Sequence, residues 1–258
     1  MLRFDVVALM TEPFFAYWGE SIMKRAIEAG LVECNATNLR DFTENKHKTV
    51  DDMPYGGGVG MVMKPEPLFK CVESIKSKND FDSWDGDKKR VIALAPTGKP
   101  FNQKMAEELS SSEHLIFICG RYEAMDQRVH DHLVDMEISL GDYILTGGEL
   151  AAMTIIDAVT RLIPGAIGGE DATLGESFSC GYLEYPQYTR PPIYREWAVP
   201  EVLLSGNHKE IEHYHIYEAL KRTVERRPDL INEHALTPLE LKIYHKLLCD
   251  LEILREKS

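Results

Sequence analysis

The 258-residue sequence lacks the features that mark several large classes of protein. It has no uninterrupted apolar run near the length of a membrane-spanning helix. Its first residues, MLRFDVVALMTEPFF, show neither the basic start nor the small-residue cleavage site of a secretion signal. The five cysteines are far apart and form no CxxC pair, so no zinc or dithiol motif is indicated. We therefore expect a cytoplasmic protein with reduced cysteines and no membrane association.

Two common phosphate-binding signatures are also missing. No GxGxxG follows the first predicted strand, which argues against dinucleotide-binding dehydrogenases and Rossmann-type methyltransferases. The glycine-rich stretch PYGGGVGM (54–61) lacks the GK[ST] ending whose lysine and hydroxyl hold phosphate and magnesium. We interpret this stretch as a surface loop with the freedom to close on a ligand.

Positive charge is scarce, because 29 Lys and Arg stand against 42 Asp and Glu, which gives a formal net charge of −13. This balance argues against indiscriminate binding of nucleic acid but leaves room for a local basic surface. Three histidines in NHKEIEHYH do not share one helical face, so the sequence predicts no fixed metal site there.

What the sequence does contain is a regular alternation of strand and helix patterns. The first part predicts a buried strand over 2–10, a helix over 20–30, a strand over 31–39, a polar loop near 40–64 and a helix over 67–78. Further on, strands at 90–96, 114–120 and 134–141 alternate with helices at 102–110, 126–134 and 149–163. Such alternation predicts an α/β fold, with a parallel sheet that is covered on both faces.

Three of these strands end in turns that contain glycine or proline, namely LAPTG (94–98), CGRYE (119–123) and SLGDYILTGG (139–148). Ligands of open α/β sheets bind beyond the carboxyl ends of the strands, so these turns should converge on one pocket. The third turn could present backbone groups to a flat heterocycle, or its glycines could allow two chain segments to cross closely, and both can hold together. Glu123 and Arg121 would lie at the pocket mouth, although a solvated turn capped by Asp126 explains them as well.

The C-terminal part has a different composition. Residues 164–198 are rich in glycine and proline and indicate a linker, and the remainder predicts helices, one of which starts near Thr237 and Pro238. We therefore predict three parts, 1–163, 164–198 and 199–258. Arginines and aromatic residues interleave here, which suits phosphates and unstacked bases, although a solvated helix face is the simpler explanation.

A series of motifs runs in order along nearly the whole chain: YGGGVGMVMKPEP, CGRYEAMDQR, EISLGDYILTGGELAAM, RLIPGAIG, YPQYTRP, VLLSGNH and RRPDL. Together they resemble the signature of the bacterial tRNA (guanine-N1)-methyltransferases of the SPOUT class. The resemblance implies a parallel-sheet methyltransferase domain with a deep trefoil knot, whose loops hold S-adenosylmethionine in a bent conformation, and a small all-helical C-terminal domain. The implied cofactor-binding residues are Leu94, Pro96, Gly120, Leu140, Gly141, Tyr143, Leu145, Gly147 and Gly148.

The resemblance also implies a reaction, the transfer of a methyl group to N1 of guanine 37, next to the tRNA anticodon. It places the base at residue 176, a positive group at Arg161 and a contact to the guanine edge at Glu123. It implies a homodimer with the active site at the subunit interface, and the use of Mg²⁺. The implied tRNA-binding residues are Arg190, Arg222, Arg226 and Arg227.

The sequence departs from the family pattern at three places. It has Glu176 where the family has the aspartate of a DSF motif, which keeps a carboxylate but moves its oxygens by more than about one ångström. Glu170 and Asp171 are weaker alternatives for the base. Val59 replaces the proline of GGGPGM, and EIEHYH (210–215) replaces a basic stretch, so the retained arginines must carry more of the RNA surface.

Two other functions are compatible with these departures. A non-catalytic RNA-binding or regulatory protein could have kept the fold without the reaction. A helical DNA-binding module joined to a small-molecule sensor would explain the C-terminal helices, but the acidic charge makes it the least favoured.

Overall fold

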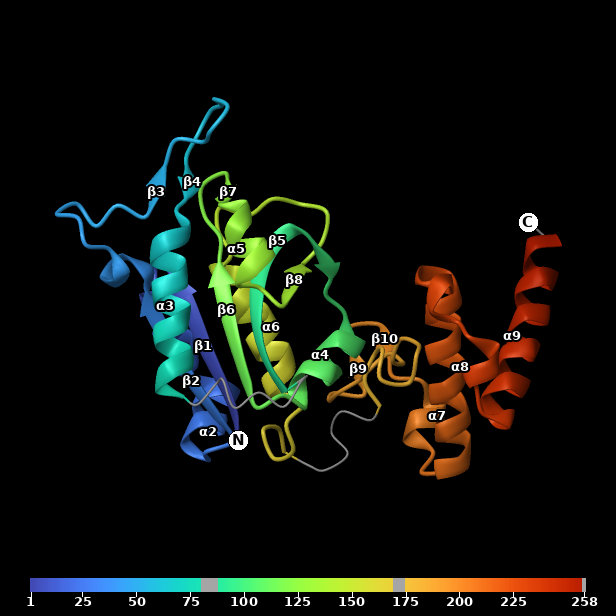
Figure 1. The fold of residues 1–258 in the computed structure, drawn as a ribbon. Coiled ribbons are helices and arrows are strands. Elements are labelled where there is room, and N and C mark those ends of the chain that lie inside the picture. Colours follow the sequence, from blue (N-terminus) through green and yellow to red (C-terminus); the bar gives the residue numbers. More distant parts are fainter. Residues whose placement is uncertain (80–87, 169–174, 257–258) are drawn as a thin grey trace. The chain divides into compact units, whose positions relative to one another are not determined.

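The computed structural model describes residues 1–79, 88–168 and 175–256, and it confirms the α/β class. The chain divides into two compact units, residues 1–170 and 171–258. The first unit is built on a five-stranded sheet in the order β2-β1-β6-β5-β8, and every neighbouring pair is parallel (Figure 1). These strands are β1 (Leu2–Ala8), β2 (Val32–Asn38), β5 (Lys89–Pro100), β6 (His114–Cys119) and β8 (Met136–Ser139).

Helices cover both faces of this sheet, as the alternating pattern predicts (Figure 1). One face packs against α1 (Glu12–Trp18), α2 (Ser21–Glu28), α4 (Gln103–Ser110) and α6 (Glu149–Thr160). The other packs against the short helix η1 (Leu39–Phe42), α3 (Pro65–Lys78) and α5 (Gln127–His132). In β6, Phe117 points into the first core and Ile116 into the second, because successive side chains of a strand face opposite sides.

Several short elements were not predicted. Helix α1 follows β1 directly, and the loop predicted near 40–64 contains β3 (Asp51–Asp52) and β4 (Val62–Met63), which form a small sheet with β7 (Ala124–Met125). The predicted linker contains a hairpin of β9 (Ile193–Tyr194) and β10 (Trp197–Ala198). Strands of two residues show no periodicity, so tertiary contacts decide whether they form.

The second unit holds the C-terminal helices α7 (Glu201–Leu204), α8 (His208–Arg226) and α9 (Pro238–Glu256), with the short helices η3 (Pro228–Leu230) and η4 (Glu233–Ala235). Helices α8 and α9 pack around Leu220, Ile243 and Leu247. The Tyr182 hydroxyl donates to Glu240 at 2.7 Å and ties the preceding segment to α9. None of the helices in the described residues has the length and hydropathy that crossing a bilayer would require.

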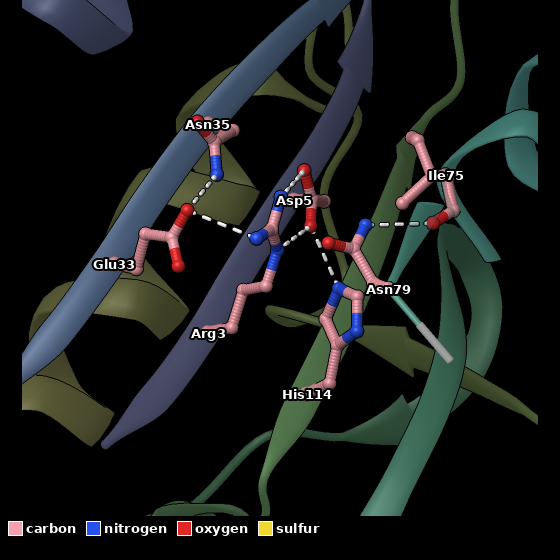
Figure 2. Close-up of polar contacts among 7 residues, drawn as sticks. All are labelled: Arg3, Asp5, Glu33, Asn35, Ile75, Asn79 and His114. Carbon is pink, nitrogen blue, oxygen red and sulfur yellow. Dashed lines mark hydrogen bonds and ion pairs between the residues drawn. The ribbon is translucent and has the colours of Figure 1, made fainter. Parts of the chain in front are cut away.

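A buried polar cluster lies on the sheet between β1 and β6, on the face covered by α3 (Figure 2). Asp5 accepts hydrogen bonds from Arg3 Nε at 2.6 Å and from His114 Nε2 at 2.7 Å, and Arg3 also reaches Glu33 at 2.9 Å. Burial alone would raise the pKa of Asp5, but the bonds from His114 and Arg3 outweigh it and lower the pKa. Asp5 therefore stays ionised inside the core.

Candidate active site

A cavity of about 570 Å³ lies at the carboxyl ends of β6 and β8 and beside residues 94–97 of β5. The turn predicted at 94–98 is a bulge inside β5, which continues to Pro100. All of the predicted cofactor-binding residues line the cavity: Leu94, Pro96, Gly120, Leu140, Gly141, Tyr143, Leu145, Gly147 and Gly148. Glu123 lines the same cavity. The sequence predicts that the segments 94–98, 119–123 and 139–148 converge on one pocket, and in the structure residues from all three line the same cavity.

Close crossings of the chain shape this cavity, and glycines make them possible. The pairing of β5 with β8 is interrupted after Leu94 and resumes at Lys99. Leu94 and Lys99 both pair with Ile138, so the residues between them bulge out of the strand. A Cβ on Gly98 would lie 2.5 Å from the backbone N of Ile138, and one on Gly148 would lie 2.8 Å from the Cα of Cys119. Both neighbours are backbone atoms that cannot turn away, so these positions require glycine.

An ion pair joins the second and third turns. Arg121 Nε donates to Glu149 Oε1 at 2.7 Å, and Glu149 is buried at the first position of α6, where the helix dipole favours a carboxylate. Glu149 Oε2 has no hydrogen-bond partner among the described residues. Gly147 lies against both side chains, because a Cβ there would lie 2.5 Å from Glu149 Oε2 and 2.9 Å from Arg121 Nε. The pair therefore fixes the backbone of the turn that opens α6.

A second polar network on the cavity wall was missed by the sequence reasoning. Thr97 Oγ1 donates to Glu137 Oε2, and His130 Nδ1 donates to Glu137 Oε1, each at 2.7 Å, and all three residues line the cavity. Burial would raise the pKa of Glu137, but these bonds outweigh it, so the pKa lies below its usual value. A charged residue within the buried strand MEIS was the signal that could have found it.

The cavity suits a small organic molecule with a flat ring and a positive charge. Its volume falls within the range of about 300–1,000 Å³ that is typical of ligand sites. Leu94 and Leu140 offer apolar walls, and Glu137 offers a carboxylate to a positive charge. Gly141, at φ +148°, opens a loop whose Tyr143 and Ile144 line the cavity and are 56% and 79% exposed. S-adenosylmethionine, which carries adenine and a sulfonium, fits this description.

The described residues give no comparable indication of a magnesium site. Within residues 1–79, 88–168 and 175–256, no three or more His, Cys, Asp or Glu side chains are grouped as metal ligands would be. The described residues therefore do not fit a fixed Mg²⁺ site.

The remaining predicted catalytic residues lie away from the cavity or in the other unit. Arg161 caps the C-terminal end of α6, whose other end opens at Gly148 on the cavity wall. With 12 residues, α6 is about 18 Å long, which is more than an arginine side chain can span. Glu176 is half-buried in the second unit, and its backbone carbonyl accepts a hydrogen bond from Ser179 at 3.2 Å. Glu170 and Asp171 lie outside the described residues.

The arginines predicted to bind tRNA differ in their surroundings. Arg190 and Arg226 are exposed, the latter in the last turn of α8. Arg222 is half-buried and donates to the backbone carbonyl of Glu184 at 3.3 Å. Arg227 forms two bonds to the carboxylate of Asp229, at 2.7 and 2.9 Å.

Fold and cavity together define an α/β protein with a cavity of ligand size at the carboxyl edge of a parallel sheet. Residues 2–233 match the family described as tRNA (Guanine-1)-methyltransferase TrmD, and the chain belongs to this family. Relatives named tRNA (guanine-N(1)-)-methyltransferase include a Brevibacillus brevis protein, 54% identical over 252 residues that cover 97% of this chain and 98% of the relative. Others come from Dictyoglomus turgidum, 52% identical over 96% and 97% of the two chains, and Dehalococcoides mccartyi, 49% identical over 96% and 98%.

Proposed function

We propose that this protein transfers a methyl group from S-adenosylmethionine to N1 of guanine 37 in tRNA, next to the anticodon. One observation carries the proposal: in a member of this family, the residues expected to bind the donor all line one cavity, and Glu123 lines it with them. The relatives are named for methylation of tRNA guanine at N1. A tRNA substrate would place the reaction in the cytoplasm.

The donor's contribution is an electrophilic methyl group on a positively charged sulfur. The turns at 94–97, 120–123 and 140–148 would hold it, with backbone groups at the ring edge and Leu94 and Leu145 against its faces. The chain at Gly98 lies directly against the backbone of β8. This close crossing supports the proposal that this part of the chain forms a trefoil knot. The proposed domains are 1–163 for methyl transfer, 164–198 as linker and 199–258 for tRNA.

On the acceptor side, the chain must remove a proton. Neutral guanine carries hydrogen on N1, so a base has to take it while a positive group stabilises the charge that develops on O6. Glu176 would accept the proton and Arg161 would face O6. Glu123, on the cavity wall, would contact the guanine edge. The target base would be turned out of the anticodon loop, as single-stranded RNA allows.

Two chains are required if Arg161 acts beside the donor, because α6 separates Arg161 from the cavity of its own chain. Exposed apolar side chains on α1 and α6 support a homodimer: Phe15 and Leu150 are 55% and 58% exposed. Tyr17 OH donates to Asp157 at 2.5 Å, so α1 and α6 present a continuous surface. Light scattering is expected to give about twice the chain mass of 29.3 kDa; the mass of a single chain in active protein would contradict the shared site.

A transfer assay tests the proposal. Protein and methyl-labelled S-adenosylmethionine are incubated with a tRNA that has guanosine at position 37, and in parallel with the same tRNA carrying adenosine there. Label is expected in the first tRNA only. Equal label in both would refute the position, and no label in either would refute the reaction and favour a non-catalytic RNA-binding role.

Substitution of Arg226 is expected to weaken tRNA binding more than substitution of Arg227. Arg226 is exposed near the end of α8, whereas the charge of Arg227 is already balanced by Asp229. Loss of one phosphate contact in Arg226→Ala should reduce the slope of log affinity against log salt concentration by about 0.7 to 1. Filter binding between 50 and 200 mM salt would measure it. If Arg226→Ala keeps the wild-type slope, this residue makes no phosphate contact.

A further inference from the structure

The glycine-rich loop before β4 is tied to the cavity by its backbone. Strands β4 and β7 pair in parallel, with Val62 opposite Ala124 and Met63 opposite Met125. On either side of this pair, Glu123 N donates to the carbonyl of Met61 at 3.1 Å and Asp126 N donates to that of Met63 at 3.0 Å. These bonds fix the register between the two segments and bring the loop before Met61 close to the turn that carries Glu123.

The residue before Met61 is Gly60, and it touches the Glu123 side chain. Its φ of +93° is in the left-handed region. A Cβ on Gly60 would overlap Glu123 Cγ and would lie 2.6 Å from Glu123 Oε1. The atoms that would be struck belong to a flexible side chain, so an added methyl group would displace the carboxylate and leave the backbone in place.

We infer that Gly60 is a positioning residue, which holds the Glu123 carboxylate at its place on the cavity wall. This inference rests on the proposed function, in which Glu123 contacts the guanine edge. The rest of the loop supplies a contrast: Tyr55 and Val59 are 101% and 94% exposed, and Gly57 at φ +79° has no atom within 4 Å of an added Cβ. Within this loop, Gly60 is therefore the residue through which the loop acts on the site.

The experiment compares Gly60→Ala with Gly57→Ala. Both substitutions place alanine at a positive φ and should strain the backbone to a similar extent. Only the added methyl group of Gly60→Ala would contact Glu123. Gly60→Ala is expected to lower kcat/KM for tRNA about tenfold or more, because small displacements at a reacting centre are costly. Its Kd for S-adenosylmethionine should stay within about twofold of wild type, and Gly57→Ala should match wild type in both. Equal losses in the two variants would overturn the inference.

Two further readouts separate positioning from general damage. In a Glu123→Ala background, Gly60→Ala should cause no additional loss, whereas a full additional loss would contradict an action through Glu123. Crystal structures of both glycine variants should show the Glu123 carboxylate moved in Gly60→Ala and unmoved in Gly57→Ala. This comparison holds even if the wild type transfers no methyl group, so failure of the proposed function and failure of the inference are distinguishable. An unmoved carboxylate in Gly60→Ala would overturn the inference.

Discussion

Replacement of Glu176 by glutamine is expected to lower the rate of methyl transfer by about 100- to 10,000-fold, the range that positioned general bases contribute. Glutamine keeps the size and polarity of the side chain but cannot accept the N1 proton of guanine at neutral pH. The loss should appear in the single-turnover rate constant, while the Kd values for donor and tRNA remain close to those of wild type.

Glu176→Asp is the matched control for this prediction. It keeps the carboxylate and restores the shorter side chain expected from the family pattern, so it should retain most of the rate. Loss in the glutamine variant with retention in the aspartate variant would support a proton acceptor at this position. Equal rates in all three proteins would place the base elsewhere in the chain.

Replacement of Asp5 by alanine is expected to cost about 3 kcal/mol of unfolding free energy. The substitution leaves His114 buried without its carboxylate and removes the hydrogen bonds that Arg3 makes to Asp5 (Figure 2). We place the loss at the lower end of the range for buried pairs, because Arg3 is partly exposed and can turn to solvent. Urea denaturation followed by circular dichroism would measure it.

Glu33→Ala is the control for Asp5. Glu33 pairs with the same arginine, but its side chain is 41% exposed, so its loss should cost less than about 1 kcal/mol. Equal destabilisation by the two substitutions would contradict a special role for the buried carboxylate.

Acid adds a second readout for Asp5. Because its pKa is lower in the folded state than in the unfolded chain, its contribution is complete above the unfolded pKa of about 3.9. The contribution is lost as the pH falls through the lower folded-state value. Asp5→Asn removes this titration, so the stability of that variant should fall less steeply than that of wild type below about pH 4. An unchanged acid slope would contradict the lowered pKa.

The sequence predicted what depends on local pattern. The apolar run of β6 showed a strand buried on both faces, and the glycines near 141 and 147 showed where the chain must bend at the end of β8. Since parallel strands end at one edge, these turns could be assigned to one pocket from the order of the strands alone.

What the sequence did not predict depends on tertiary contacts. The pairing of β4 with β7 joins residues far apart in the chain, and its two-residue strands carry no periodic signal. The bonds of Glu137 to Thr97 and His130 likewise require three elements to meet. The distance between Arg161 and the cavity could have been predicted from the sequence, because it follows from the length of the helix between them.

The most direct test of this account is a calorimetric titration of the folded, purified protein with S-adenosylmethionine. The account predicts saturable binding, since we propose that the cavity beside β5, β6 and β8 holds this donor. Absence of binding by protein that circular dichroism shows to be folded would contradict it.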